Sequence, residues 1–360
     1  MSMTKSEEIT SLISSKFFLK QFTYSEIYVL KDSQEQEFCD CMLEFSNVYI
    51  CIQIKEKSDK VKVTPEKWFK DRVLNKAKKQ LRDTFNYFKN EEYKIFSKNT
   101  ELHIDRNKAI IPLIVFLNND VSNYYRIVVS KTLNRIINIF NYEDFSTMLN
   151  TLILPYDIIS YLNYRIAFKQ VDEGKIIFDN IDDSSTIVAC PHNEKDYAEL
   201  FLAHYYYKTI IENKLSEENI KFYNTIIYQL NEMRGCLRDN FLSGFLQVDY
   251  VRADTISQKW QDFVKYAKQD KFVAPFKFTI DDRVYMFFVK PKSLTETEFQ
   301  IRMDLCLVYY KYKHNENLAH ILLFKNEENE QYSVSIGDVN LNTDIPYESL
   351  IETAIEFFEK

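Results

Sequence analysis

The chain has 360 residues, of which 46% are hydrophobic, so it is long enough for two domains with apolar cores and too apolar for intrinsic disorder. It contains only four glycines and neither a GxGxxG nor a GxxxxGK motif, which excludes the two common glycine-rich phosphate loops. The net charge is −7, but residues 55–108 hold sixteen Lys and Arg against nine Asp and Glu, whereas residues 315–360 hold two against ten. The basic segment suits a nucleic-acid backbone, and it is equally typical of a solvated helix face.

The first elements can be predicted in chain order. Thr4 and Glu7 have the spacing of a capping box at the start of a helix. Residues 22–30 then predict a strand. Two β-prone runs, 38–45 and 48–55, follow on either side of a polar pair and predict a hairpin.

The hairpin would bring three polar side chains together. With residues 46 and 47 as the turn, Asp40 lies directly opposite Gln53, at a Cβ separation of ~5 Å. Gln53 and Lys55 leave the strand on one face, and the apolar run before them indicates a strand buried on both faces. Buried polar groups need partners, so we predict a cluster of an acid, an amide oxygen and a cation that could hold a divalent metal and a phosphate. The charged solvent face of an edge hairpin is the alternative.

The following segments continue the alternation of helices and strands. Thr64 and Pro65 predict the start of a second helix that runs to about Lys89, and residues 110–117 predict another buried strand. The order is therefore helix, three strands, helix, strand. Further downstream we expect a strand at 124–130 and helices at 142–152 and from Pro155.

A polar, aspartate-rich segment between residues 174 and 185 predicts the boundary between one domain at 1–175 and a second at 185–360. The second domain is predicted as α+β. Its helices are expected at 194–213, 216–234, 256–268 and 350–358, and its strands at 284–290, 302–311, 318–324 and 331–336.

The cellular environment is predicted from cysteines and hydropathy. The six cysteines show no disulfide or zinc spacing, and several lie in apolar runs, so they are expected to be reduced core residues of a cytosolic protein. The amino terminus lacks an apolar signal region, and the longest apolar stretch, 109–117, is too short to cross a bilayer. We therefore expect a cytoplasmic protein with no membrane partner.

The element order, with Asp40 on the second strand and Gln53-Ile54-Lys55 on the third, resembles the PD-(D/E)xK nuclease superfamily, which includes restriction endonucleases. The resemblance covers about residues 4–120 and implies an α/β fold: a restriction-endonuclease-like αβββαβ core, here followed by an α+β domain. Cys39 stands where the motif has proline, and Gln53 stands where it usually has glutamate. The second departure removes one negative charge and puts activity in question.

The resemblance implies a metal-dependent nuclease that hydrolyses phosphodiester bonds of DNA, in defence against foreign DNA or in repair. Asp40, the Gln53 amide oxygen and the Ile54 carbonyl would bind Mg²⁺ or Mn²⁺, which take oxygen ligands. Lys55 would orient the attacking water or stabilise charge on the phosphate.

Other residues match positions that approach the active site in this superfamily. Gln80 on the second helix is one, with a surface glutamine as the alternative. An acid from the first helix is another, and Glu8 matches it best because Glu7 is occupied by the cap. Glu26 on the first strand is a weaker candidate. The residues expected to hold the nucleic-acid backbone are Lys76, Lys78, Lys79 and Arg82.

Two alternatives remain. One is a catalytically inactive nuclease-fold protein that binds nucleic acid or protein, which Gln53 favours modestly. The other is an interaction protein whose residues 185–360 bind a protein partner or a second copy. Clusters at Tyr205–Tyr207 and Tyr309-Tyr310 are typical of cores and interfaces. The sequence leaves open DNA or RNA, endo- or exonuclease action, sequence preference and oligomeric state.

Overall fold

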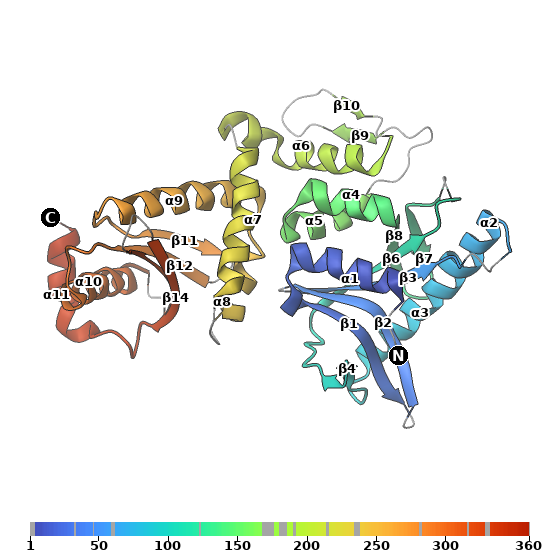
Figure 1. Cartoon of the computed structure of the whole chain (residues 1–360), viewed down its shortest axis with the longest axis horizontal. Coiled ribbons are helices and arrows are strands. Elements are labelled where there is room, and N and C mark those ends of the chain that lie inside the picture. The colour runs from blue at the N-terminus through green and yellow to red at the C-terminus, as the bar shows by residue number, and fades with distance from the viewer. Residues whose placement is uncertain are drawn as a thin grey trace. The chain divides into compact units, whose positions relative to one another are not determined.

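The computed structural model describes residues 4–31, 34–45, 47–58, 62–121, 124–167, 176–179, 186–189, 192–213, 216–233, 238–280, 283–314, 317–327 and 332–359. The chain forms two compact units, Met1–Lys214 and Leu215–Lys360. It is a mixed α/β protein, with a large mixed sheet flanked by helices in the first unit and a smaller sheet in the second (Figure 1).

The first unit contains most of the strands. Its helices are α1 (Lys5–Phe18), the short η1 (Lys20–Phe22), α2 (Pro65–Trp68), η2 (Phe69–Ala77), α3 (Lys78–Lys89), α4 (Tyr142–Leu152), α5 (Pro155–Ala167) and α6 (Glu194–Asn213). Its strands are β1 (Thr23–Lys31), β2 (Gln34–Phe45), β3 (Val48–Glu56), β4 (Ile95–Ser97), β5 (Thr100–Glu101), β6 (Ala109–Leu117), β7 (Ile127–Ser130), β8 (Arg135–Asn141), β9 (Ile176–Asp179) and β10 (Thr186–Ala189). The segments α2, η2 and α3 follow one another without a break, and we call residues 65–89 the long helix.

The predicted order of helix, three strands, helix and strand is confirmed for α1, β1 to β3, the long helix and β6. Eight strands form one sheet in the order β5-β4-β1-β2-β3-β6-β8-β7. The pairs β3–β6 and β6–β8 are parallel, and the other pairs are antiparallel. The sequence prediction missed β8 and the two short strands β4 and β5 at one end of the sheet. It also missed that the middle of the long helix, η2, is π-helical.

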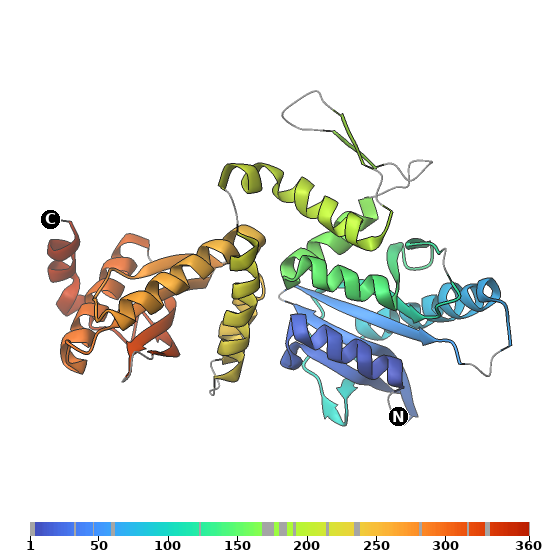
Figure 2. The ribbon, with the colours of Figure 1, turned by 45° about the horizontal axis from the view of Figure 1, so that its top comes forward.

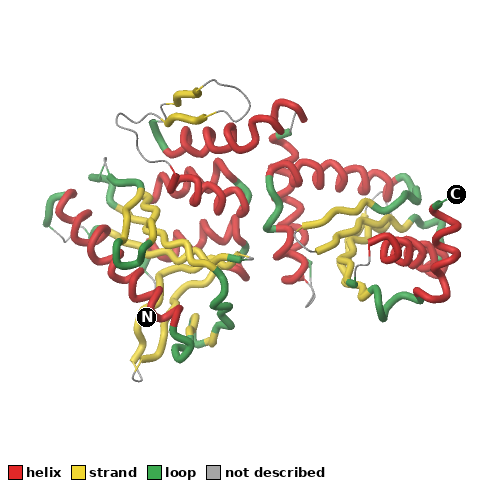
Figure 3. The backbone as a smooth tube through the Cα atoms, turned by 180° about the vertical axis from the view of Figure 1, so that it is seen from behind, coloured by secondary structure: helices red, strands yellow, loops and turns green. Residues whose placement is uncertain are grey.

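Helices cover both faces of this sheet (Figures 2 and 3). α1 and α4 contact each other, and α1 packs against β1, β2 and β3. On the other face, apolar residues of the long helix such as Leu81 share one core cluster with Tyr49 and Cys51 of β3. Gln53 and Lys55 continue the alternation of Tyr49 and Cys51 along β3, so they project towards the long helix.

The two units divide after Lys214 and not at 175–185 as predicted from the sequence. Much of that predicted boundary, 168–175 and 180–185, lies outside the described residues. α6 follows the predicted boundary but packs against α4, and Glu194 at its start pairs with Arg165 of α5 at 3.0 Å. These contacts place α6 in the first unit.

The second unit contains α7 (Glu217–Glu232), α8 (Arg238–Phe245), α9 (Tyr250–Lys268), α10 (Glu296–His314) and α11 (Tyr347–Phe358). Its sheet has the order β11 (Phe276–Ile280), β12 (Arg283–Lys290), β13 (Leu318–Asn326) and β14 (Tyr332–Asn340). The strands β12 and β13 are parallel, and α10 connects them. The predicted strands at 284–290, 318–324 and 331–336 and the closing helix are confirmed, whereas α8 and β11 were missed.

The predicted strand at 302–311 is wrong, because these residues lie within α10. A short apolar run does not by itself distinguish a buried strand from a buried helix. The start of this helix does carry a clear signal: Thr295 and Glu298 form a reciprocal cap, with 2.9 Å between the Thr295 nitrogen and the Glu298 carboxylate.

Gly244 of α8 has no room for a side chain. A Cβ atom there would lie 1.8 Å from the hydroxyl oxygen of Tyr285, whose buried ring is held between Phe241, Phe245 and other aromatic side chains. We expect Gly244→Ala to lower the free energy of unfolding by about 1–3 kcal/mol, as measured by chemical denaturation. Gly337 of β14 is the control, since no atom lies within 4 Å of a Cβ placed there. Equal effects of the two alanines would contradict this account.

Two general predictions can be compared with the described residues. The cysteines among them, Cys39, Cys41, Cys51 and Cys306, are buried and form no disulfide. Burial raises the pKa of the Cys306 thiol to about 12, as expected for a core residue. Within the described part of the chain, none of the helices combines the length and the apolar character that crossing a membrane requires.

Candidate active site

The predicted hairpin register is confirmed. Phe45 pairs with Val48 next to the turn, and the same register continues to the pair of Cys41 and Ile52. Beyond that point the two strands separate, because β2 stays paired with β1 while β3 stays paired with β6 as far as Glu56. Asp40 and Gln53 would form the next pair, so they sit at the point of separation. There the Asp40 side chain replaces a main-chain acceptor: its Oδ2 accepts a hydrogen bond from the Ile54 N–H at 2.6 Å.

Lys55 brings the predicted cluster together. Its Nζ donates to Asp40 Oδ2 at 3.3 Å, to Gln53 Oε1 at 3.1 Å and to the Ile54 carbonyl at 2.7 Å. An ammonium has three hydrogens, so these three oxygens satisfy it completely. The side chains of Lys55 and Asp40 are only 11% and 9% exposed, and Gln53 is 0% exposed. The three oxygens predicted as metal ligands therefore already surround one cation, which belongs to the chain itself.

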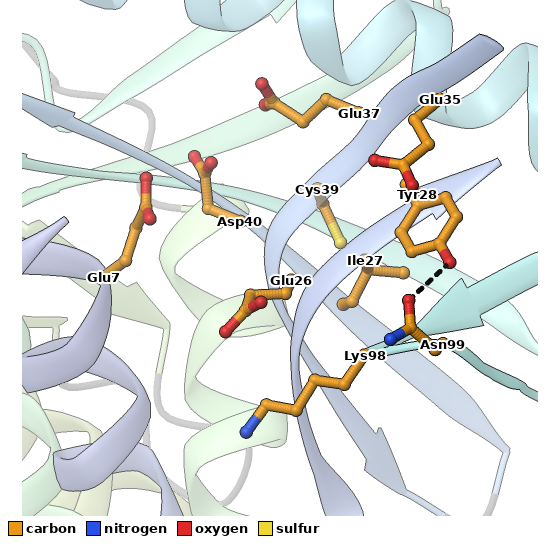
Figure 4. A pocket seen from close by; sticks show the side chains of 10 residues that line it. All are labelled: Glu7, Glu26, Ile27, Tyr28, Glu35, Glu37, Cys39, Asp40, Lys98 and Asn99. Atoms are coloured by element: carbon orange, nitrogen blue, oxygen red, sulfur yellow. Dashed lines mark hydrogen bonds between the residues drawn. The ribbon is translucent and has the colours of Figure 1, made fainter. Parts of the chain in front are cut away.

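An acidic pocket of about 410 Å³ opens beside this cluster (Figure 4). Five carboxylates line it, together with one ammonium from Lys98. The acids come from α1, β1 and β2 and are Glu7, Glu26, Glu35, Glu37 and Asp40. At neutral pH such a pocket attracts cations and repels an unaccompanied phosphate.

Two of these acids correct or refine the sequence prediction. Glu8 is exposed on α1 and does not line the pocket, whereas Glu7 does, although it also caps the helix by accepting the Thr4 N–H at 2.8 Å. One residue can therefore both cap the helix and line the pocket. Glu26 lines the pocket with a φ of 52°, a conformation that costs free energy in residues other than glycine. Backbone strain of this kind concentrates at functional sites.

Glu37 connects the pocket with the long helix. Its Oε1 accepts a hydrogen bond from Gln80 Nε2 at 2.8 Å, so Gln80 reaches the site through Glu37, as a partner of an acid and not as a surface residue. Burial and the neighbouring Asp40 carboxylate raise the pKa of Glu37, and Lys55, the Gln53 amide and Lys76 oppose that rise. The side chains of Asp40, Gln53 and Lys55 therefore all influence the ionisation of Glu37.

The four basic residues predicted to hold a backbone all lie on the long helix. Lys76 and Lys79 are exposed, and Lys78 and Arg82 are half-buried. Arg82 pairs with Asp83 at 3.4 Å, whereas Lys76 is near enough to Glu37 to lower its pKa. Of this group, Lys76 is the one that the electrostatics connect to the pocket.

The residues present fit a hard divalent cation in ligand type. Asp40, Gln53 and Ile54 contribute oxygens only, which suits Mg²⁺ or Mn²⁺. Across the part of the chain that the structure describes, no group of three or more His, Cys, Asp and Glu side chains could hold a metal by itself. A cation at this site would therefore depend on the amide and main-chain oxygens as well as on carboxylates. Comparison of the chain with protein-family models, curated proteins and solved structures found no match.

Proposed function

We propose that this protein is a divalent-metal-dependent nuclease with a restriction-endonuclease-like αβββαβ core in its first unit, and that it hydrolyses phosphodiester bonds of DNA. The observation that carries the proposal is the arrangement around Lys55 Nζ, where Asp40, Gln53 and the Ile54 carbonyl hold a cation at the point where β2 and β3 separate. The adjacent acidic pocket supports the requirement for a metal, because it repels a phosphodiester unless cations neutralise it.

The residues of the chain have distinct roles in this proposal. Asp40, the Gln53 amide oxygen and the Ile54 carbonyl would hold the metal, which when bound lowers the pKa of a water and neutralises charge on the scissile phosphate. Lys55 would donate hydrogen bonds to the attacking water or to the phosphate as negative charge builds up on it. Lys76 would hold the nucleic-acid backbone beside the pocket.

The direct test is incubation of the purified full chain with duplex DNA, single-stranded DNA and RNA in Mg²⁺ or Mn²⁺. We expect cleavage of DNA that EDTA abolishes and that Asp40→Ala and Lys55→Ala reduce by at least about 10²-fold. The two variants, purified in the same way, also control for a contaminating nuclease. Cleavage at the wild-type rate by both variants would show that the site has been assigned wrongly.

A second candidate function is a nuclease-fold protein that binds nucleic acid without cutting it. The observation that favours it is that the Lys55 ammonium already fills the oxygen cluster, which carries one negative charge less than a site with glutamate at position 53. This candidate predicts retention of labelled DNA in EDTA and Mg²⁺ alike, without cleavage in either. Metal-dependent turnover would contradict it.

A further inference from the structure

Strand β2 contains a β-bulge two residues before Asp40. Ile27 of β1 faces Cys39, but the next residue, Tyr28, faces Glu37, so Phe38 is an extra residue in β2.

The bulge changes which side chains share a face. In a regular strand, Glu37 and Asp40 are three residues apart and point to opposite faces. One inserted residue shifts the alternation by one, so the two acids come to the same side of β2, as Figure 4 shows. Gln80 Nε2 then holds the Glu37 carboxylate at 2.8 Å, and both Glu37 and Asp40 line the acidic pocket.

The buried side chain of Gln53 lies between Glu37 and Lys55. Its side chain is 0% exposed, its Oε1 accepts a hydrogen bond from Lys55 Nζ at 3.1 Å, and its amide interacts as a donor with the Glu37 carboxylate, which lowers the pKa of Glu37. A buried amide nitrogen needs an acceptor, and the Glu37 carboxylate is the acceptor beside it. Gln53 therefore connects Glu37 with Lys55, and through Lys55 with Asp40, so the Glu37 carboxylate belongs to the same cluster.

We propose that Glu37 supplies the second carboxylate of the cation site, in place of an acid at position 53, and that the bulge at Phe38 directs it there. The proposal rests on the function proposed above in naming the cation as Mg²⁺ or Mn²⁺. Together Asp40 and Glu37 provide two negative charges, which offset the charge that Gln53 lacks. Gln80 is the positioning residue that fixes the orientation of Glu37.

The experiment measures binding of Mn²⁺ to the full chain without nucleic acid, by calorimetry or electron paramagnetic resonance. We expect Glu37→Gln to weaken Mn²⁺ binding about tenfold or more. Adding Gln53→Glu to that variant should restore the affinity, because it returns a carboxylate to the cluster. Glu35→Gln is the matched control: Glu35 is an exposed acid of the same strand and pocket, and its loss should change the affinity less than about twofold.

The outcomes separate this inference from the proposed function. Equal losses in the Glu37 and Glu35 variants, failure of Gln53→Glu to restore binding, or a wild-type chain that binds no Mn²⁺ would each overturn the role of Glu37. Binding of Mn²⁺ that depends on Glu37, in a protein that cuts no nucleic acid, would support that role and reject the nuclease. Circular dichroism of each variant would show that the fold is retained.

Discussion

Lys55→Met is expected to lower the rate of DNA cleavage by about 10²- to 10³-fold while it strengthens the binding of Mn²⁺. The rate falls because an ammonium that stabilises developing charge is lost. Binding improves because the Lys55 ammonium no longer competes for the oxygens of Asp40, Gln53 and Ile54. Without metal, the free energy of unfolding of this variant should also be about 1–3 kcal/mol lower than that of the metal-free wild type, because the largely buried Asp40 carboxylate loses the Lys55 ammonium.

Lys57→Met is the matched control for this variant. Lys57 follows two residues later and pairs with Asp120 at 2.7 Å; the Lys57 side chain is 18% exposed, but the Asp120 side chain is 63% exposed, so its carboxylate stays solvated when the lysine is lost. Its loss should leave cleavage and Mn²⁺ affinity nearly unchanged. Weaker Mn²⁺ binding in Lys55→Met would contradict competition between the ammonium and the metal for one set of oxygens.

Glu194→Gln is expected to destabilise the first unit by about 3–5 kcal/mol, measured as the free energy of unfolding. Glu194 is 0% exposed and pairs with Arg126 at 2.6 Å and with Arg165 at 3.0 Å, while the Tyr161 hydroxyl donates to its other oxygen at 2.6 Å. Burial lowers the pKa of Arg165, but the Glu194 carboxylate and other neighbouring groups together raise it by a larger amount. The pKa of Arg165 is therefore raised overall, and the guanidinium stays charged. Glutamine would leave two guanidinium groups, one of them buried, without a counter-charge.

A surface acid of the same helix provides the comparison. Glu199 pairs with Lys195 one helical turn away at 3.3 Å, and both side chains are more than half exposed. Glu199→Gln should change the free energy of unfolding by less than about 0.5 kcal/mol. A similar loss in both variants would mean that burial of the Glu194 pairs does not account for the effect.

The centre of the candidate site could be predicted from the sequence because it depends on local geometry. A two-residue turn fixes the register of β2 and β3, and that register brings Asp40, Gln53 and Lys55 together without knowledge of the remaining fold. Glu37 could not be found in this way. Its orientation depends on a bulge that becomes visible only when β1 is paired with β2, and Phe38 itself gives no sign of it.

The errors in the fold have similar causes. The apolar run within α10 suits a strand as well as a helix, and the capping residues Thr295 and Glu298 were the signal that distinguishes them. The domain boundary was misplaced because the ion pair between Arg165 and Glu194 joins residues on either side of the polar segment. A change in composition gives no information about such a contact.

The ammonium of Lys55 also has a consequence for how the protein matures. Many small metal sites gather charged ligands that repel one another until the ion arrives, so the chain folds only when it is loaded. Here the positive partner is covalently attached two residues from Gln53, and the oxygens of Asp40, Gln53 and Ile54 are satisfied without any ion from solution. We therefore expect the chain to fold without Mg²⁺ in this site, and a chelator to strip the site without unfolding the protein.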